Sequence, residues 1–302
     1  MTPLRIAALV AVVAFAPVRA QTIDIALDPE VPIAGLPVSA AVAFTGFTPE
    51  AVTVFVRTVG TSAFQELAAE DQGNGTWRVS LPFVAPAEGT EAFVRYIRDG
   101  QTQTEPEVDP ENDPLRVPSF IAALASDVTL PARQYRMVTV PVQLGDVGGL
   151  PVALGSAAPL DVFGDDFGVS GDPSQWRILR WNEGAGRSID GLAEAGAFPQ
   201  LRPGTGYWLI TSGGGTFDVE AGLSTGVIVA DGTTIREAIS VPLASGWTQI
   251  GNPFLFPIAW ADVERPAGVE DPVAFDGQYA GGQTVLRPFE GYFVFNAGGP
   301  AT

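Results

Sequence analysis

The residues in this sequence best suited to chemistry are acidic. Asp161, Asp165 and Asp166 form its densest acidic cluster. Two carboxylates can act together in glycoside hydrolysis, and carboxylates also bind hard cations such as Ca²⁺. Near the N-terminus of a helix, carboxylates have a simpler role. They accept hydrogen bonds from free backbone N–H groups and interact favourably with the positive end of the helix dipole. We therefore interpret this cluster as helix capping on a solvated face rather than as a catalytic or calcium site.

A second acidic group follows the first hundred residues. Its side-chain oxygens could coordinate a hard cation, but their spacing does not match an EF-hand loop. The residues are Asp109, Glu111, Asn112 and Asp113. We favour a solvated acidic segment here. The sequence thus predicts no metal site and no cofactor.

Most other catalytic arrangements are excluded by composition. The chain has no His and no Cys, which removes Ser–His and Cys–His nucleophiles, His-ligated zinc and disulfides. No phosphate-binding glycine motif stands between a strand and a helix. We interpret Gly213-Gly214-Gly215 as a hairpin turn, because the next residues continue as a strand. No catalytic residue is predicted, and an acid-pair hydrolase is the least favoured function.

Aromatic side chains are the other candidates for a site. Exposed aromatic rings stack on sugars in many binding modules, whereas large aromatics in short-stranded β domains usually fill the core. Tyr207, Trp208, Leu209 and Ile210 are apolar on both faces of a predicted strand, which favours the core. The candidates concentrated toward the C-terminal half are Trp176, Trp181, Tyr207, Trp208, Trp247 and Trp260.

Composition also limits the fold and the partners. The 302 residues are 46% hydrophobic, and 35 Gly and 26 Pro imply many turns between short strands, in about two domains. All 16 basic residues are Arg, and the net charge is −18. Such a chain repels phosphate backbones and anionic lipids, so we expect neither nucleic-acid nor membrane-surface binding.

The N-terminus predicts a signal peptide over residues 1–20. Arg5 is a short positive region, residues 6–18 are apolar, and Val18-Arg19-Ala20 is a small-x-small cleavage site. The apolar run is shorter than the ~20 residues that cross a bilayer, although an uncleaved anchor remains the alternative. Losing residues 1–20 takes the net charge from −18 to −20. The mature chain is then secreted, with no further membrane span.

Residues 21–117 have the pattern of a β-sandwich. Alternating apolar residues predict short strands, and Asn74-Gly75 is the strongest hairpin signal. Residues 101–118 are acidic and carry four Pro, so we predict that they form a linker. The predicted strands are 22–27, 38–44, 52–58, 64–68, 76–83 and 91–98.

These strands resemble an immunoglobulin-like module common in secreted bacterial surface proteins. The resemblance rests on Val52-Thr-Val-Phe-Val-Arg-Thr58, Gly75-Thr-Trp-Arg-Val-Ser-Leu-Pro82 and Phe93-Val-Arg-Tyr-Ile-Arg-Asp99. It covers roughly 22–117 and implies an immunoglobulin-like sandwich. It says almost nothing about a ligand.

The rest of the chain, 119–302, contains a repeat. Leu201-Arg-Pro-Gly-Thr-Gly-Tyr207 returns as Leu286-Arg-Pro-Phe-Glu-Gly-Tyr292. Each copy is preceded by a strand ending in Pro, a short helical segment and a hairpin-like strand. We therefore predict a pseudo-duplicated β module, a sandwich or barrel-like domain, with half-units of about 133–225 and 238–302. The matching segments are 135–141 and 247–253, 159–167 and 259–263, and 176–181 and 273–279.

The duplication makes specific structural predictions. Tyr207 and Tyr292 should occupy equivalent places in one shared core. Gly206 and Gly291 should have φ > 0 or be pressed against neighbouring backbone. Gly246-Trp-Thr-Gln-Ile-Gly-Asn-Pro-Phe254 and Pro203-Gly-Thr-Gly-Tyr-Trp-Leu-Ile210 resemble a β-rich module that often follows immunoglobulin-like domains in secreted bacterial proteins. This resemblance implies architecture and location, not activity.

Together these features predict a secreted, non-enzymatic structural or interaction module of the bacterial exterior or cell surface. Its partner would be an unidentified extracellular macromolecule, either protein or glycan, reached through loops and sheet edges. The alternative is a carbohydrate-binding accessory protein that uses exposed Trp.

Overall fold

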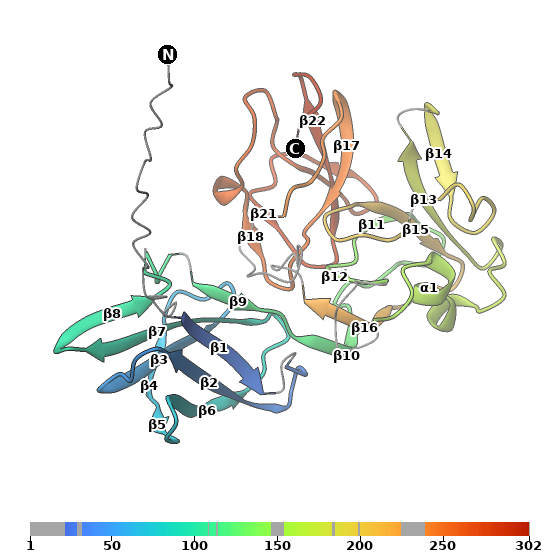
Figure 1. The fold of residues 1–302 in the computed structure, drawn as a ribbon. Coiled ribbons are helices and arrows are strands. Elements are labelled where there is room, and N and C mark those ends of the chain that lie inside the picture. The colour runs from blue at the N-terminus through green and yellow to red at the C-terminus, as the bar shows by residue number, and fades with distance from the viewer. Residues whose placement is uncertain are drawn as a thin grey trace, which may run out of the picture.

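The protein is all-β in the computed structural model, with antiparallel sheets and a single α-helix among the described residues (Figure 1). The structure describes residues 22–28, 32–107, 109–112, 114–145, 154–182, 185–198, 200–224 and 239–301. The predicted signal peptide, Asp113 and the predicted boundary between the half-units lie outside them. No helix in the described part is long and apolar enough to cross a membrane.

The N-terminal part is a β-sandwich of two antiparallel sheets. One sheet has the order β1-β2-β6-β5, and the other has the order β4-β3-β7-β8 with β9 also paired to β7. Apolar residues at alternate positions, such as Val42, Val54, Val94 and Trp77, point between the sheets and form one core. The strands are β1 (Thr22–Asp28), β2 (Pro37–Thr45), β3 (Ala51–Thr58), β4 (Gln65–Ala68), β5 (Glu70–Asp71), β6 (Thr76–Val84), β7 (Thr90–Arg98), β8 (Gln101–Glu105) and β9 (Leu115–Val117).

All six predicted strands of this part are present to within one residue at each end. Asn74 and Gly75 both have positive φ, 54° and 82°, in the turn that joins β5 to β6. The hairpin prediction is therefore confirmed.

The linker prediction for 101–118 is wrong. Within it, β8 and β9 pair with successive parts of β7 and so complete the sheet, leaving only the Pro-rich loop between them outside it. The strand was missed because β8 reads Gln-Thr-Gln-Thr-Glu and lies at an edge. An edge strand with a solvated face needs no apolar alternation.

Among its described residues, the C-terminal part contains four antiparallel sheets of two to four strands. Their orders are β10-β16-β12, β11-β15-β13-β14, β17-β22-β19-β20 and β18-β21. The elements are β10 (Phe120–Ala125), β11 (Arg136–Val138), β12 (Val142–Gln143), α1 (Pro159–Phe167), β13 (Trp176–Asn182), β14 (Arg187–Asp190), β15 (Tyr207–Thr211), β16 (Asp218–Ser224), β17 (Gly246–Gly251), β18 (Ile258–Ala259), the 3₁₀ turn η1 (Trp260–Asp262), β19 (Val273–Phe275), β20 (Tyr279–Ala280), β21 (Val285–Leu286) and β22 (Gly291–Asn296).

The two four-stranded sheets share one plan. In each, the strand after the repeated Leu-Arg-Pro motif lies between the first strand of its half-unit and a hairpin. The register also agrees, because Val138 faces Tyr207 and Ile250 faces Tyr292. Both tyrosine hydroxyls accept a backbone N–H five residues earlier, at 3.0 Å and 2.8 Å. The repeated sequence therefore has the same structural place in both half-units.

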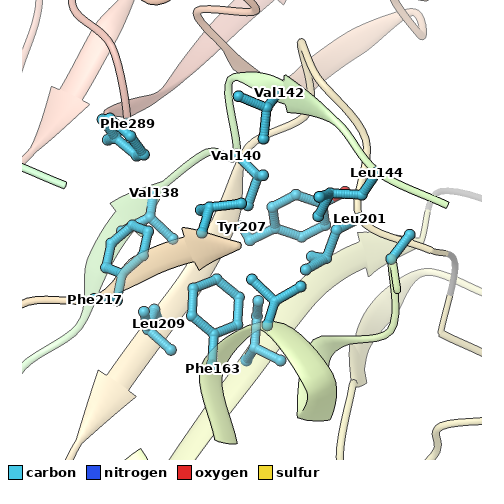
Figure 2. Close-up of a cluster of buried hydrophobic side chains, with 14 of the residues drawn as sticks. Val138, Val140, Val142, Leu144, Phe163, Leu201, Tyr207, Leu209, Phe217 and Phe289 are labelled. Atoms are coloured by element: carbon cyan, nitrogen blue, oxygen red, sulfur yellow. The ribbon is translucent and has the colours of Figure 1, made fainter. Parts of the chain in front are cut away.

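The prediction that Tyr207 and Tyr292 share one core is wrong, because each half-unit has its own core. Tyr207 packs with Val140, Leu144 and Leu201 in the larger cluster, which α1 covers (Figure 2). Tyr292 belongs to a separate cluster built by the second half-unit. The reason is that each sheet faces its own short helical segment, so each encloses its own interior.

The half-units are joined by a reciprocal backbone contact. Thr205 forms a bridge with Ile250, and Glu290 forms the corresponding bridge with Val138. The turn before β15 thus meets β17, and the turn before β22 meets β11. A Cβ on Gly206 would lie 2.5 Å from the carbonyl oxygen of Ile250, whereas a Cβ on Gly291 would lie 3.0 Å from that of Val138.

These distances decide between the two predicted reasons for the repeated glycine. Gly206 and Gly291 do not have positive φ, but both are pressed against backbone of the other half-unit. The left-handed residue is two positions earlier, Gly204 at 78° in one copy and Phe289 at 60° in the other. The repeated glycine is required by close approach rather than by its own dihedral angles.

Candidate functional site

The acidic cluster on α1 serves the structure. Asp161 lies in the first turn of the helix, where the dipole favours a negative charge, although no side chain caps the N-terminus. Asp166 accepts the backbone N–H of Asp218 at 3.0 Å and so ties α1 to β16. Asp161, Asp165 and Asp166 are all exposed. The prediction of a solvated face is confirmed, and the prediction of capping is wrong.

The second acidic group is organised by its own loop. Asn112 donates from its side chain to the Asp109 carboxylate at 2.8 Å, and the Glu111 carbonyl accepts a hydrogen bond from Arg57. Among the residues that the structure describes, no three His, Cys, Asp or Glu side chains are placed to hold a metal ion.

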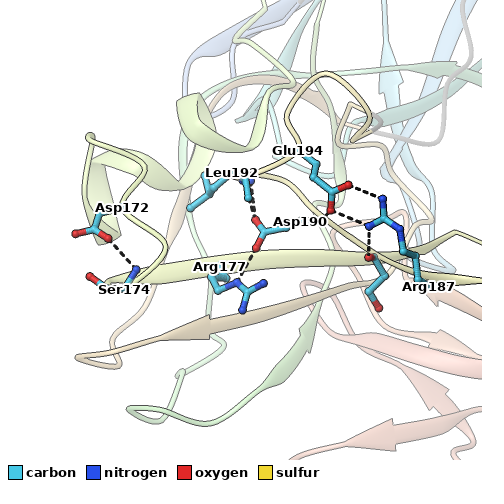
Figure 3. A network of polar contacts seen from close by, with 9 residues as sticks. Asp172, Ser174, Arg177, Arg187, Asp190, Leu192 and Glu194 are labelled. Carbon is cyan, nitrogen blue, oxygen red and sulfur yellow. Dashed lines mark hydrogen bonds and ion pairs between the residues drawn. The ribbon is translucent and has the colours of Figure 1, made fainter. Parts of the chain in front are cut away.

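A third polar network was not expected from the sequence (Figure 3). Asp190 is 3% exposed, accepts the N–H groups of Leu192 and Ala193, and accepts Arg177 Nε at 2.6 Å. The neighbouring Arg187 guanidinium makes two hydrogen bonds to Glu194 and lowers the pKa of that carboxyl. These groups hold the turn after β14, and their acceptor oxygens are already used.

The triple glycine at 213–215 is a turn but not a hairpin. It joins β15 to β16, which belong to different sheets. Gly215 pairs with Leu130, and a Cβ on Gly214 would lie 2.8 Å from the Leu130 carbonyl oxygen. The hairpin prediction is wrong because this turn packs against a neighbouring segment instead of closing a two-stranded ladder.

One pocket holds two carboxylates, which is the arrangement that a glycosidase would need. It lies in the N-terminal sandwich, has a volume of about 450 Å³, and is lined by Glu105 and Glu107. Both acids come from one short segment of the chain, whereas Ile23 and Phe47, which other segments contribute to the lining, are apolar. Glycosidase carboxylates flank the scissile bond from two sides. The pocket therefore gives no support to an acid-pair hydrolase.

The six aromatic candidates differ in burial, and Trp208 is half-buried between the two extremes. Trp176, Tyr207 and Trp260 are at most 5% exposed, so the core interpretation is confirmed for them. Trp176 also donates its indole N–H to the Gly168 carbonyl. Burial raises the pKa of the Tyr207 and Tyr292 hydroxyls. Trp181 and Trp247 are exposed, so the core interpretation is wrong for them.

Trp247 belongs to a continuous group of rings that reaches solvent, here named the aromatic surface. Its rings are linked by centroid distances from 4.8 Å between Trp208 and Phe275 to 6.1 Å between Trp247 and Phe293. Trp247 is 50% exposed and Tyr279 is 66% exposed, while the others are partly covered. The members are Tyr135, Trp208, Trp247, Phe275, Tyr279, Phe293 and Phe295.

Strand alternation and the reciprocal junction together build this surface. In β22, Tyr292 and Val294 point into the core, so Phe293 and Phe295 point away from it. Trp208 has the same place in β15 as Phe293 in β22, and the junction brings the two rings within 5.7 Å. Rings from both half-units therefore form one surface.

Phe275 and Tyr279 complete the surface from the β19–β20 hairpin. They face each other across its turn, with ring centroids 4.9 Å apart. Neither these two rings nor Phe293 and Phe295 are among the aromatic candidates predicted from the sequence. The available signal was the alternation of aromatic with other residues in β22, together with a Gly-containing turn between two aromatics.

The surface is rich in aromatic edges but is not a flat platform. Neighbouring rings are inclined at 85° for Trp247 and Phe293, and at 64° for Phe275 and Tyr279. Asp276 in the β19–β20 turn is exposed, so a carboxylate lies beside the rings. This arrangement can bury apolar groups of a partner and accept hydrogen bonds at its rim.

No protein-family model matches the chain, and no curated protein sequence matches it.

Proposed function

We propose that this chain is a secreted, non-catalytic module of the bacterial exterior that binds a protein partner through the aromatic surface. The carrying observation is the contiguous group of seven rings, of which Trp247 and Tyr279 are at least half exposed. Tyr and Trp are enriched at protein interfaces, where each ring buries a large area at little cost in conformational entropy.

Two further observations support the location and the class. Residues 1–20 have the pattern of a signal peptide. The sheets β1-β2-β6-β5 and β4-β3-β7-β8 have the strand order of an immunoglobulin-like sandwich, which supports the resemblance of 22–117 to such modules. The acidic side chains singled out from the sequence are exposed or serve loops and turns, which supports a non-catalytic role.

A glycan is the alternative partner for the same surface. Sugar-binding platforms present coplanar rings, whereas neighbouring rings here meet at steep angles. The geometry therefore favours a protein partner, whose side chains can enter between inclined rings.

The test is binding of the purified chain to the cell envelope of the bacterium that produces it. A Trp247→Ala/Tyr279→Ala variant should bind about tenfold more weakly, because two exposed anchors are removed from the surface. Trp181→Ala is the matched control, since Trp181 is 40% exposed and has no ring contact with the group among the described residues. Its binding should equal that of the unmodified chain.

Equal binding by the double variant and the control would refute the role of the aromatic surface. A glycan array probed with the same three proteins distinguishes the partners. Glycan binding that is lost only in the double variant would replace the protein partner by a carbohydrate.

A further inference from the structure

A second feature, independent of the aromatic surface, lies in the N-terminal sandwich. β1 is the edge strand of one sheet, and β8 is the edge strand of the other (Figure 1). In the described part of the chain no strand pairs with the outer side of either. The pocket of about 450 Å³ lies between them, with Ile23 of β1 on one side and β8 residues on the other. The side of this sandwich is therefore open.

The β7–β8 turn determines which backbone groups of β8 face outward. Asp99 and Gly100 have φ of 52° and 69°, the signature of a two-residue type I′ turn. In such a turn the flanking residues, Arg98 and Gln101, form a hydrogen-bonded pair. Pairs alternate along an antiparallel ladder between hydrogen-bonded and non-hydrogen-bonded.

Thr102 and Thr104 consequently point their backbone N–H and C=O groups away from β7. The carbonyl of Ile97, the partner of Thr102, agrees with this register, because it accepts the Glu50 N–H on the opposite side of β7. Two donors and two acceptors thus lie along the open edge of β8. This is the pattern to which an additional strand binds.

The pocket beside this edge has an aromatic floor and two acidic side chains in its lining. Tyr96 and Phe47 form the floor, with ring centroids 5.7 Å apart, and the Tyr96 hydroxyl donates to Gln103 at 2.7 Å. Gln103 faces Tyr96 across the ladder, so side chains on this face of an added strand would lie over the same rings. Glu105, the last residue of β8, and Glu107, two residues after it, also line the pocket.

We propose that β8 binds an extended, lysine-bearing peptide segment of a partner as an additional strand. The segment pairs with the backbone of Thr102 and Thr104. One lysine stem lies over Tyr96, beside the Phe47 ring that Arg98 covers, and brings its ammonium group to Glu105 and Glu107. Aromatic faces attract cations, and a lysine stem tolerates apolar surroundings while its charge stays near water.

Charge selects this occupant over the others. The chain has a net charge of −18, so a second copy or an acidic segment would be repelled from the pocket. Arg98 also lines the pocket, but its guanidinium stacks on Phe47 at 4.4 Å and lies 3.6 Å from the Asp99 carboxylate. The lining as a whole carries two carboxylates against one guanidinium, which is a net negative charge.

The probe is a fluorescein-labelled, end-capped octapeptide of alternating Thr and Lys, measured by fluorescence anisotropy with the purified chain. Saturable binding that weakens with salt is expected. The same peptide with Glu in place of Lys should not bind. An absence of saturation up to about 1 mM peptide, the weakest affinity that a specific site of this kind would show, overturns the proposal. Equal binding of the Glu peptide also overturns it.

Variants of β8 test the backbone pairing. Thr104→Pro removes one outward N–H without touching the β7 ladder, and proline is tolerated at such edge positions. Binding should weaken about tenfold, because one hydrogen bond is lost and a peptide carbonyl is left unpaired. Thr104→Val is the matched control that keeps the N–H and should bind normally. Equal affinity of the two variants refutes strand pairing.

Two further measurements keep the outcome decisive. If Thr104→Pro does not fold, the octapeptide with N-methyl groups at alternate residues replaces it and should bind about tenfold more weakly than the unmodified peptide. Glu105→Gln/Glu107→Gln should weaken binding several-fold and reduce its salt dependence. Unchanged binding by that variant refutes the lysine pocket. A dimer of the chain that Thr104→Pro dissociates would identify a second copy as the occupant instead.

Discussion

Gly206→Ala tests the reciprocal junction between the half-units. The added Cβ would lie 2.5 Å from the Ile250 carbonyl oxygen and 3.2 Å from its carbon and nitrogen. Those atoms belong to β17, so no flexible side chain can move aside. The two strands must separate by about 1 Å to restore ordinary contact distances of 3.5 Å or more.

The cost follows from the contacts at this point. Gly251 donates to the Gly204 carbonyl at 3.0 Å, and Gly206 donates to the Gln249 carbonyl at 3.4 Å. Loss of two hydrogen bonds costs about 1–3 kcal/mol, and overpacking adds about 1–3 kcal/mol. The lower backbone entropy of unfolded Ala offsets about 0.4–1 kcal/mol. We expect Gly206→Ala to lower the free energy of unfolding by about 2–4 kcal/mol.

Gly291→Ala perturbs the other side of the junction less. Its nearest backbone atom is the Val138 carbonyl oxygen at 3.0 Å, so a shift of a few tenths of an ångström suffices. We expect a loss of about 1–2 kcal/mol. Gly213→Ala is the control, because nothing lies within 4 Å of its added Cβ and its φ is not positive. It should change stability by less than about 0.5 kcal/mol.

The measurement is urea unfolding of the three variants and the unmodified chain, followed by tryptophan fluorescence. The expected order of destabilisation is Gly206→Ala, then Gly291→Ala, then Gly213→Ala. If Gly206→Ala is no less stable than Gly213→Ala, the two half-units do not meet as closely as this reasoning requires.

Further predictions concern the tyrosines, pH, salt and the domain boundary. Tyr207→Phe and Tyr292→Phe should each destabilise by about 1–2 kcal/mol in urea unfolding, because the N–H groups of Arg202 and Arg287 lose their acceptor. Burial raises the pKa of both tyrosines, so above about pH 10 the unfolded chain binds fewer protons than the native chain. The urea midpoint should therefore fall as pH rises past 10, and a flat profile would contradict this. Sodium and potassium chloride should raise the melting temperature equally, since both screen the net charge; a calcium response that saturates at micromolar levels would indicate a metal site. Residues 22–117 should unfold cooperatively on their own in thermal denaturation, and a fragment without a transition would refute that boundary.

The sequence alone predicted the elements whose burial follows a simple period. Trp77, Val79 and Leu81 alternate with polar residues, and β6 forms where they lie. Pro159 begins α1 within its predicted bounds, because proline suits the first turn of a helix. These signals are local. An apolar face indicates that an element is covered on that side, and this holds whichever element packs against it. The repeated Leu-Arg-Pro motif likewise predicted two equivalent strands.

Edge strands and close contacts could not be predicted in this way. β8 is polar at every position, and only its pairing with β7 shows that 101–105 is a strand. The sequence identified Gly206 as special, but its reason, the carbonyl of Ile250, lies in the other half-unit. Both features depend on residues distant in the sequence.

The aromatic surface shows the same division most clearly. The sequence determined that Tyr207 and Trp208 occupy opposite faces of an apolar strand. The tertiary structure decided that Tyr207 is enclosed by the core under α1, whereas Trp208 meets Phe275 and Phe293 of the second half-unit. Alternation assigns a side chain to a face, but only the elements packed across that face decide whether it is buried or reaches solvent.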